Sequence, residues 1–195
     1  MGRRKNAGLS FYEKEKKITP DLIKRILGFL FWMVMAVVLA YFLVYFYGIR
    51  TTMVGNSMES TLYNGQEVLI DRVIYSFSSP KEGNVVVFLP NGNENSHYYI
   101  KRIIGVPGDK IVIRDGVLYK NGDAVLDYFS QSIADPGIAV NEIRLAEDEY
   151  FVMGDNCNSS EDSRSANVGA VNLNTIKGKV WFHMAANDEG IGLVR

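Results

Sequence analysis

The chain has 195 residues, of which 22% are charged and 12% aromatic, and its formal net charge is -1. This length leaves room for one folded domain of about 145 residues beside a membrane anchor, and the composition excludes long disordered tracts. A single cysteine, Cys157, excludes an intrachain disulfide, so the fold must be stabilised by its core.

The N-terminal segment, residues 1–25, is basic. It contains eight Lys/Arg and three Asp/Glu, so it carries a charge of about +5 and the rest of the chain about -6. Basic residues before an apolar segment favour retention of the N-terminus on the cytoplasmic side of a membrane. We therefore interpret residues 1–25 as a basic cytoplasmic tail.

Residues 26–48 form an uncharged apolar run, ILGFLFWMVMAVVLAYFLVYFYG. As a helix it would span about 34 Å, enough to cross a bilayer core of about 30 Å. A cleaved secretory signal is the alternative, but its apolar stretch is about 7–15 residues and ends at a small-x-small site. This run is longer and ends in Tyr45, Phe46 and Tyr47, which suit a membrane interface. We predict an uncleaved signal-anchor helix, a single crossing of the cell membrane, and an extracytoplasmic domain over residues 49–195.

The remainder of the chain is typical of a mostly β domain. Short segments rich in Val, Ile, Phe and Tyr alternate with turn signals such as Asp115-Gly116 and Asn121-Gly122. The predicted strands are Glu67–Tyr75, Asn84–Leu89, Tyr98–Val106, Lys110–Ile113, Val117–Tyr119, Tyr150–Met153 and Lys179–His183. Several short strands must protect their edges, which favours a closed or partly closed barrel. Residues 123–148 carry fewer strand signals, and we place a small surface insertion over about 110–148.

Ser57 follows the predicted membrane helix closely, in Gly55-Asn56-Ser57-Met58-Glu59. A serine nucleophile needs a base, because a free hydroxyl is barely ionised near neutral pH. The chain has only two histidines, His97 and His183. A Ser-His-Asp triad is not excluded by count, but the G-x-S-x-G turn that often presents such a serine is absent.

Lys101 is the alternative base. An ordinary lysine, with a pKa near 10.4, is neutral in only about one molecule in 2,500 at pH 7, but burial favours the neutral amine. Lys101 lies in the apolar segment 98–105, where strand alternation places it on the face of Tyr99 and Ile103. A solvated lysine at a strand edge is the simpler interpretation of this pattern alone.

A polar segment, residues 154–164, follows the predicted strand Tyr150–Met153 and has the spacing G-D-N-x3-S-x-D-S-R. Taken alone it is a loop of caps and Asx turns. Its spacing, however, resembles the last block of the type I signal peptidases. The resemblance extends to three earlier blocks in the same order, Gly55–Leu62, Gly83–Phe88 and Lys101–Asp109, behind a single anchor. The chain is most similar to the short Gram-positive form.

The resemblance implies a Ser/Lys dyad, with Ser57 as nucleophile and Lys101 as general base. It implies that Ser160 hydrogen-bonds the lysine amine and that Asp162 and Arg164 form an ion pair that shapes the site. The oxyanion would be bound by the Ser57 N–H. Some relatives add a hydroxyl at the position of Gly55, and Met58 belongs to the nucleophile block. No metal or cofactor is implied.

Three further positions depart from the usual family pattern. The family usually has Pro where Ser60 stands, Asp where Asn84 stands and Arg where Cys157 stands. The Cys157 thiol has no histidine nearby in sequence, so we interpret it as a small passive residue and not as a nucleophile.

The resemblance implies a membrane-anchored endopeptidase that removes signal peptides from exported preproteins through an acyl-enzyme. Its expected partners are signal peptides and the lipid bilayer, with the export machinery as a further candidate and no nucleic acid. One alternative is a catalytically impaired homologue that binds preproteins without cutting them. Another is a self-cleaving Ser/Lys protease of the repressor type, although those are soluble and carry a DNA-binding domain.

Overall fold

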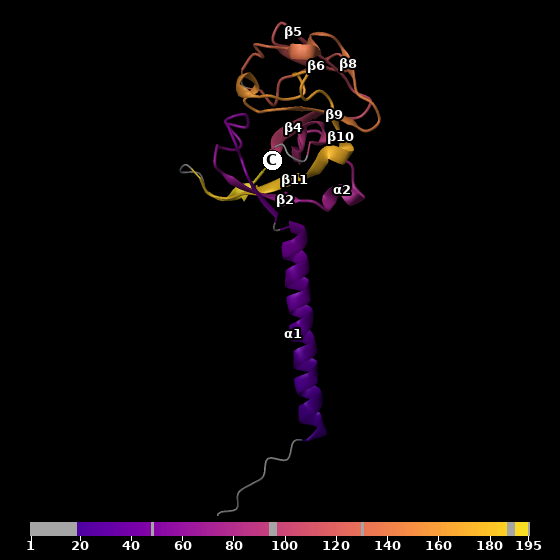
Figure 1. Cartoon of the computed structure of the whole chain (residues 1–195), viewed down its shortest axis with the longest axis vertical. Helices are drawn as coiled ribbons and strands as arrows, with labels where there is room; N and C mark the ends of the chain where they lie inside the picture. The colour runs from indigo at the N-terminus through magenta and orange to yellow at the C-terminus, as the bar shows by residue number, and fades with distance from the viewer. Residues whose placement is uncertain (1–18, 48, 94–96, 130, 187–189, 195) are drawn as a thin grey trace, which may run out of the picture. The chain divides into compact units, whose positions relative to one another are not determined.

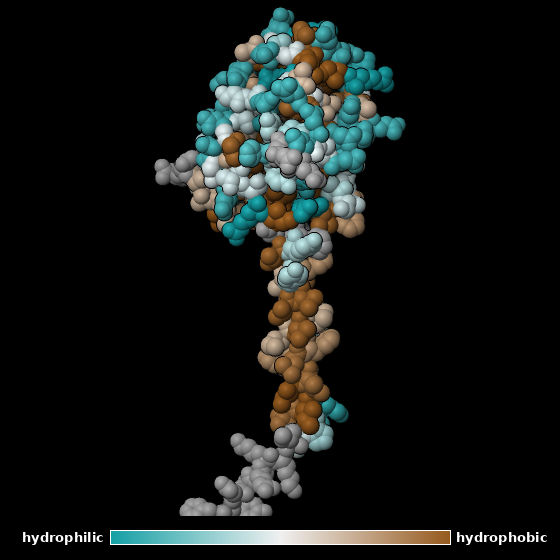
Figure 2. Space-filling view, viewed as in Figure 1, coloured by the Kyte–Doolittle hydropathy of each residue, from teal (hydrophilic) through white to brown (hydrophobic). Residues whose placement is uncertain are grey.

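A computed structural model describes residues 19–47, 49–93, 97–129, 131–186 and 190–194. Contacts divide the chain into two units, one ending at Tyr41 and one beginning at Phe42. The first unit consists of most of helix α1, Pro20–Tyr47. Its stretch Pro20–Tyr45 is long and apolar enough to cross a membrane, and Figure 2 shows apolar side chains along the length of the visible face.

Helix α1 begins six residues earlier than predicted, because proline is well tolerated at the first helical position and Asp21 complements the helix dipole in the first turn. The helix therefore includes Pro20–Arg25, the last residues of the predicted tail. Residues 1–18 of that tail, and residue 48 at the predicted end of the helix, lie outside the described residues.

The second unit is built on an antiparallel sheet in the order β1-β2-β11-β3-β4-β9-β10, with β12 paired to β11. Among the described strands β1 and β10 remain the two edges, so the sheet is a half-barrel and not a closed barrel. Its strands are β1 Ile49–Thr52, β2 Glu67–Asp71, β3 Val85–Phe88, β4 Tyr99–Gly105, β9 Glu149–Met153, β10 Val171–Asn172, β11 Ile176–His183 and β12 Gly192–Leu193.

A smaller antiparallel sheet, ordered β7-β6-β5-β8, occupies the predicted insertion. Its strands are β5 Lys110–Arg114, β6 Val117–Lys120, β7 Asp123–Val125 and β8 Ile143–Arg144. In Figure 1 the labelled strands β5, β6 and β8 lie together at the end of this domain opposite β2 and β11. The turns at Asp115-Gly116 and Asn121-Gly122 have positive φ at both residues, as tight hairpins require. The segment 123–148, predicted to be poor in strands, supplies β7 and β8.

The predicted strand Glu67–Tyr75 ends early, at Asp71. The Asp71 carboxylate accepts hydrogen bonds from the backbone N–H groups of Val73 and Ile74, at 2.9 and 3.1 Å. These bonds turn the chain after the strand, ahead of the short helix α2, Ile74–Phe77. Short 3-10 turns occur at Pro90–Gly92, Gly137–Val140, Cys157–Ser159 and Leu173–Thr175.

Strand β4 runs through the centre of the domain and is buried from Ile100 to Gly105. On one side Ile100 packs in a core cluster with Met58 and Leu62. Ile103 belongs to a second cluster that includes Phe88 and Val152, and Ile104 to a third under the smaller sheet. A strand buried on both faces can carry charged residues only if each charge is paired or neutralised, and this strand carries Lys101 and Arg102 in succession.

Candidate active site

Ser57 lies in a long loop between β1 and β2. The loop is closed at its base by backbone bonds, from the Met53 N–H to the Gln66 carbonyl and from the Gly65 N–H to the Met53 carbonyl, both 2.8 Å. Within it, Met58 and Leu62 are fully buried, and the Leu62 N–H donates to the Met58 carbonyl. Met58 therefore holds the turn at Ser57 from the core side.

Lys101 approaches Ser57 from β4. Its Nζ donates a hydrogen bond of 2.5 Å to Ser57 Oγ, and β4 pairs Lys101 with Val86 of β3. Both side chains are buried, with 7% of Ser57 and 5% of Lys101 exposed. The Nζ also lies 5.6 Å from the centre of the Tyr99 ring, as expected for residues on one face of a strand. The simpler interpretation of Lys101 as a solvated edge charge is therefore wrong.

The environment of Lys101 favours the neutral amine. Burial lowers the pKa of Lys101 from 10.5 to about 8, and Arg164 also lowers it, whereas Asp162, Glu161 and Asp155 raise it. With a pKa near 8, roughly one molecule in ten is neutral at pH 7, compared with about one in 2,500 for an ordinary lysine. This arrangement supplies a base that is available near neutral pH.

The segment 154–164 fixes the backbone at Ser57. The Asn156 N–H donates to the Ser57 carbonyl at 3.1 Å, and Asn156 Nδ2 donates to the Asn56 carbonyl at 3.2 Å. Gly154 lies so close that a Cβ there would be 2.3 Å from the Ser57 carbonyl oxygen. A close approach of this kind is possible only without a side chain.

The expected ion pair between Asp162 and Arg164 is present and buried. Arg164 Nε lies 2.8 Å from Asp162 Oδ1, and Arg164 also donates to the backbone carbonyls of Cys157 and Asp135. Asp162 Oδ2 accepts the Gly154 N–H at 3.1 Å. The Asp162–Arg164 ion pair thus holds the backbone at Gly154 and at Cys157, on either side of Asn156, which contacts Ser57.

The hydrogen bond expected between Ser160 and the Lys101 amine is not formed. Ser160 Oγ is buried and has no hydrogen-bond partner among the described residues. It lies beside Gly154, where an added Cβ would be 2.4 Å from it. The close contact of Lys101 with Ser57 and the packing of Ser160 against Gly154 account for the difference.

A second buried ion pair, which the sequence did not predict, lies on the other face of β4. Arg102 binds Asp155 through two hydrogen bonds, at 2.8 Å from Nε and 2.6 Å from Nη2. Thr61 donates to Asp155 Oδ2 at 2.5 Å, and Arg102 donates to the Gly83 carbonyl at 2.8 Å. The sequence did indicate that Arg102 needs a partner. Strand alternation places Arg102 on the face opposite Lys101, and a buried arginine requires a counter-charge.

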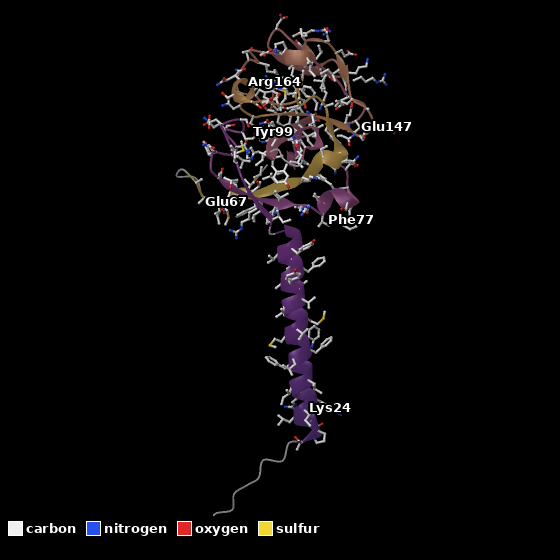
Figure 3. The ribbon with its side chains drawn as sticks, viewed as in Figure 1. Lys24, Glu67, Phe77, Tyr99, Glu147 and Arg164 are labelled. Carbon is white, nitrogen blue, oxygen red and sulfur yellow. The ribbon has the colours of Figure 1, made fainter. Side chains whose placement is uncertain are left out.

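A cavity of about 330 Å³ opens on Ser57 and Lys101. Its wall contains Met53, Val54 and Ile100 as well as Tyr99, His97 and Glu161. Figure 3 labels Tyr99 in the centre of the domain. Strand β9 pairs with β4 only from Arg102 onward, so no described strand pairs with Tyr99–Lys101 on the side opposite β3. This free strand edge beside the cavity could bind an extended peptide.

Donors for an oxyanion are few. The Ser57 N–H has no acceptor among the described residues, whereas the Gly55 N–H donates to Asn64 Oδ1 at 2.9 Å. Gly55 has a φ of +80° and no side chain. No hydrogen bond joins either histidine to Ser57 in the described part of the chain; His183 Nδ1 lies 2.9 Å from the buried Gln66 Nε2. No three His, Cys, Asp or Glu side chains in the described ranges form a group that could hold a metal ion.

The three departures from the family pattern have local explanations. Ser60 has a φ of +86°, which proline cannot adopt. Asn84 Oδ1 accepts hydrogen bonds from Tyr75 and the Lys81 N–H, both 3.2 Å. Cys157 is 3% exposed, and burial raises the pKa of its thiol although Arg164 lowers it. The buried, protonated thiol fits the passive role inferred from the sequence.

Comparisons with known proteins agree with the resemblance read from the sequence. Residues 26–185 match the family described as signal peptidase, peptidase S26. The chain is 30% identical over 175 residues to signal peptidase I P of Bacillus subtilis subsp. natto, covering 86% of this chain and 91% of that protein. It is 35% identical over 147 residues to signal peptidase IB of Staphylococcus aureus strain COL, covering 67% and 74%.

Among solved structures, a signal peptidase I from Enterococcus faecalis V583 is 28% identical, with a TM-score of 0.43. The match covers 53% of this chain and 97% of that one.

Proposed function

We propose that this chain, which belongs to the signal peptidase family, peptidase S26, removes signal peptides from exported preproteins. The catalytic groups would be a Ser57/Lys101 dyad. The observation that carries this proposal is the buried 2.5 Å contact between Lys101 Nζ and Ser57 Oγ. A buried serine in contact with a lysine of lowered pKa is an activated nucleophile beside its base.

The reaction would begin with neutral Lys101 taking the Ser57 proton while Oγ attacks the scissile carbonyl. The developing oxyanion would be stabilised by the Ser57 N–H, the donor left unpaired beside the cavity. The Lys101 ammonium then protonates the leaving amine, and the acyl group remains on Oγ. Water, deprotonated by Lys101, hydrolyses this ester and restores the serine.

Substrate would bind in extended form along the free edge at Tyr99–Lys101. The apolar wall at Met53, Val54 and Ile100 suits small apolar residues, and the family resemblance implies residues such as Ala at the first and third positions before the cut. Signal peptides of preproteins are therefore the proposed substrates.

The supporting residues would act by positioning. Asp162 and Arg164 fix the segment that binds the Ser57 carbonyl through Asn156. Ser160 would contact the lysine amine only after a change of its side-chain rotamer. Its hydroxyl has no hydrogen-bond partner among the described residues, so this change would break no hydrogen bond. Met58 holds the nucleophile turn in the core, and Gly55 lines the cavity with a positive φ that favours glycine.

The test uses the full chain in detergent and a model preprotein, with the new N-terminus identified by mass spectrometry. Ser57→Ala and Lys101→Ala are each expected to abolish cleavage. Ser76→Ala and Lys110→Ala, which remove an exposed serine and an exposed lysine, serve as matched controls and should cleave like wild type. Retained cleavage in either dyad variant would rule out the mechanism. Nothing in the described residues favours the catalytically impaired alternative.

We further propose that α1 anchors the protein in the cell membrane with a cytoplasmic N-terminus, in contact with the lipid bilayer and within reach of the export machinery. The basic residues before the helix support this orientation. Protease added outside intact spheroplasts should digest the domain beyond residue 48. Protection of that domain would contradict the orientation.

A further inference from the structure

Two chemically different sets of side chains line the cavity at Ser57 and Lys101. Met53, Val54 and Ile100 are apolar and suit the small residues before the cut. Tyr99, Ser159 and Glu161 are polar, and Glu161 is the one carboxylate among the described lining residues. The proposed function assigns no role to Glu161.

The Glu161 carboxylate is held in place from two sides. Tyr99 Oη donates to Glu161 Oε2 at 2.9 Å, and Asn167 Nδ2 donates to Oε1 at 3.3 Å. Asn167 is itself held through its carbonyl, which accepts from Asn91 Nδ2 at 2.6 Å. Two donors from separate segments give the carboxylate a defined position on the cavity wall, although Glu161 is otherwise exposed.

The chemistry of the dyad indicates which part of the substrate Glu161 faces. The ammonium formed at Lys101 must reach the leaving amine, so the residue after the cut lies beside Lys101 Nζ. That Nζ lies 5.6 Å from the centre of the Tyr99 ring, and the hydroxyl of the same ring binds Glu161. The Tyr99 side chain thus contacts Glu161 and lies near Lys101 Nζ, where the leaving group is expected.

On the basis of the proposed function, we propose that Glu161 is a specificity-determining residue that contacts the first residue of the mature protein and favours a basic side chain there. Lys101 is uncharged when it acts as base, and His97 is the one other described lining residue that can carry a positive charge. The carboxylate is therefore not neutralised by Lys101 in the reactive state. It attracts a lysine or arginine after the cut and repels an aspartate or glutamate.

The experiment compares three preproteins that differ only in the first residue after the cut, which is Lys, Gln or Glu. Cleavage by the full chain in detergent is measured as kcat/KM at low salt. For an exposed carboxylate we expect about a threefold preference for Lys over Gln, and a similar one for Gln over Glu. Raising the salt concentration should reduce both preferences, since screening weakens exposed charge pairs.

Glu161→Gln should bring the three rates within error of one another. Glutamine keeps an oxygen to accept the Tyr99 hydrogen bond, and the ratio of substrates cancels any change in the basicity of Lys101. Glu147→Gln is the matched control, because Glu147 is an exposed carboxylate that does not line the cavity and lies apart from Tyr99 in Figure 3. This control should retain the wild-type ratios.

The inference is overturned if wild type cleaves all three preproteins equally, or if Glu161→Gln retains the preference for Lys over Glu. The salt dependence of the wild-type ratios tests it without any variant. Failure to cleave any of the three would reject the proposed function, whereas cleavage without charge preference would reject only the role of Glu161.

Discussion

The pH dependence of cleavage should follow the deprotonation of Lys101. Its pKa is lowered from 10.5 to about 8, first by burial. If only the neutral amine is active, the active fraction rises from about one tenth at pH 7 to about nine tenths at pH 9. The value of kcat/KM should therefore rise about tenfold over this interval and level off above it. With an ordinary lysine the rate would still be rising tenfold per pH unit at pH 9.

Glu161→Gln should shift the pH profile of kcat/KM in one predicted direction. The negative charge of Glu161 raises the pKa of Lys101, so its removal should shift the rising limb toward lower pH. The control Glu147→Gln should leave the limb in place, because that carboxylate is not among the groups that act on Lys101.

The assay is a fluorogenic signal-peptide substrate with a neutral residue after the cut, measured in detergent from pH 5 to pH 10. A profile that is flat from pH 5 to pH 9 would refute the role of Lys101 as base. A rate that still rises about tenfold per pH unit at pH 9 would show that Lys101 is not desolvated in the working enzyme. A shift to higher pH in Glu161→Gln would contradict the electrostatic argument.

Substitutions at three other positions test the scaffold around the site. Asp155→Ala removes the carboxylate that Arg102 binds in the interior and should lower the free energy of unfolding by about 3–5 kcal/mol; unchanged urea denaturation would show that the pair contributes little. Ser60→Gly should stabilise the chain by about 0.5 kcal/mol, because glycine adopts the positive φ without strain, whereas Ser60→Pro should destabilise it. The opposite order of melting temperatures would mean that this turn has a different conformation in solution. In Gly154→Ala the added Cβ would clash with the Ser57 carbonyl and should reduce kcat on the order of 100-fold, with the far-UV circular dichroism unchanged. Full activity would show that the loop can move to accommodate the methyl group.

Much of the fold could be predicted because its signals are local. The apolar run 26–48 predicts its helix by length alone, and the hairpin at Asp115-Gly116 is predicted by the residues that tolerate positive φ. The same local signals failed at the start of α1, where Pro20 extends the helix into the charged segment. They also missed strands of two residues such as β8 and β10, which have too few residues for an alternating pattern.

The resemblance of four sequence blocks to the signal peptidases indicated Ser57, Lys101, Asp162 and Arg164 as candidate site residues. Which of these groups lie in contact could be seen only in the folded domain. The 2.5 Å contact of Lys101 with Ser57, the pairing of Arg102 with Asp155 and the unpartnered hydroxyl of Ser160 join segments far apart in the chain. Such contacts depend on strand register and side-chain packing, which are properties of the whole core. A local pattern can indicate that a buried charge needs a partner, but not which distant residue supplies it.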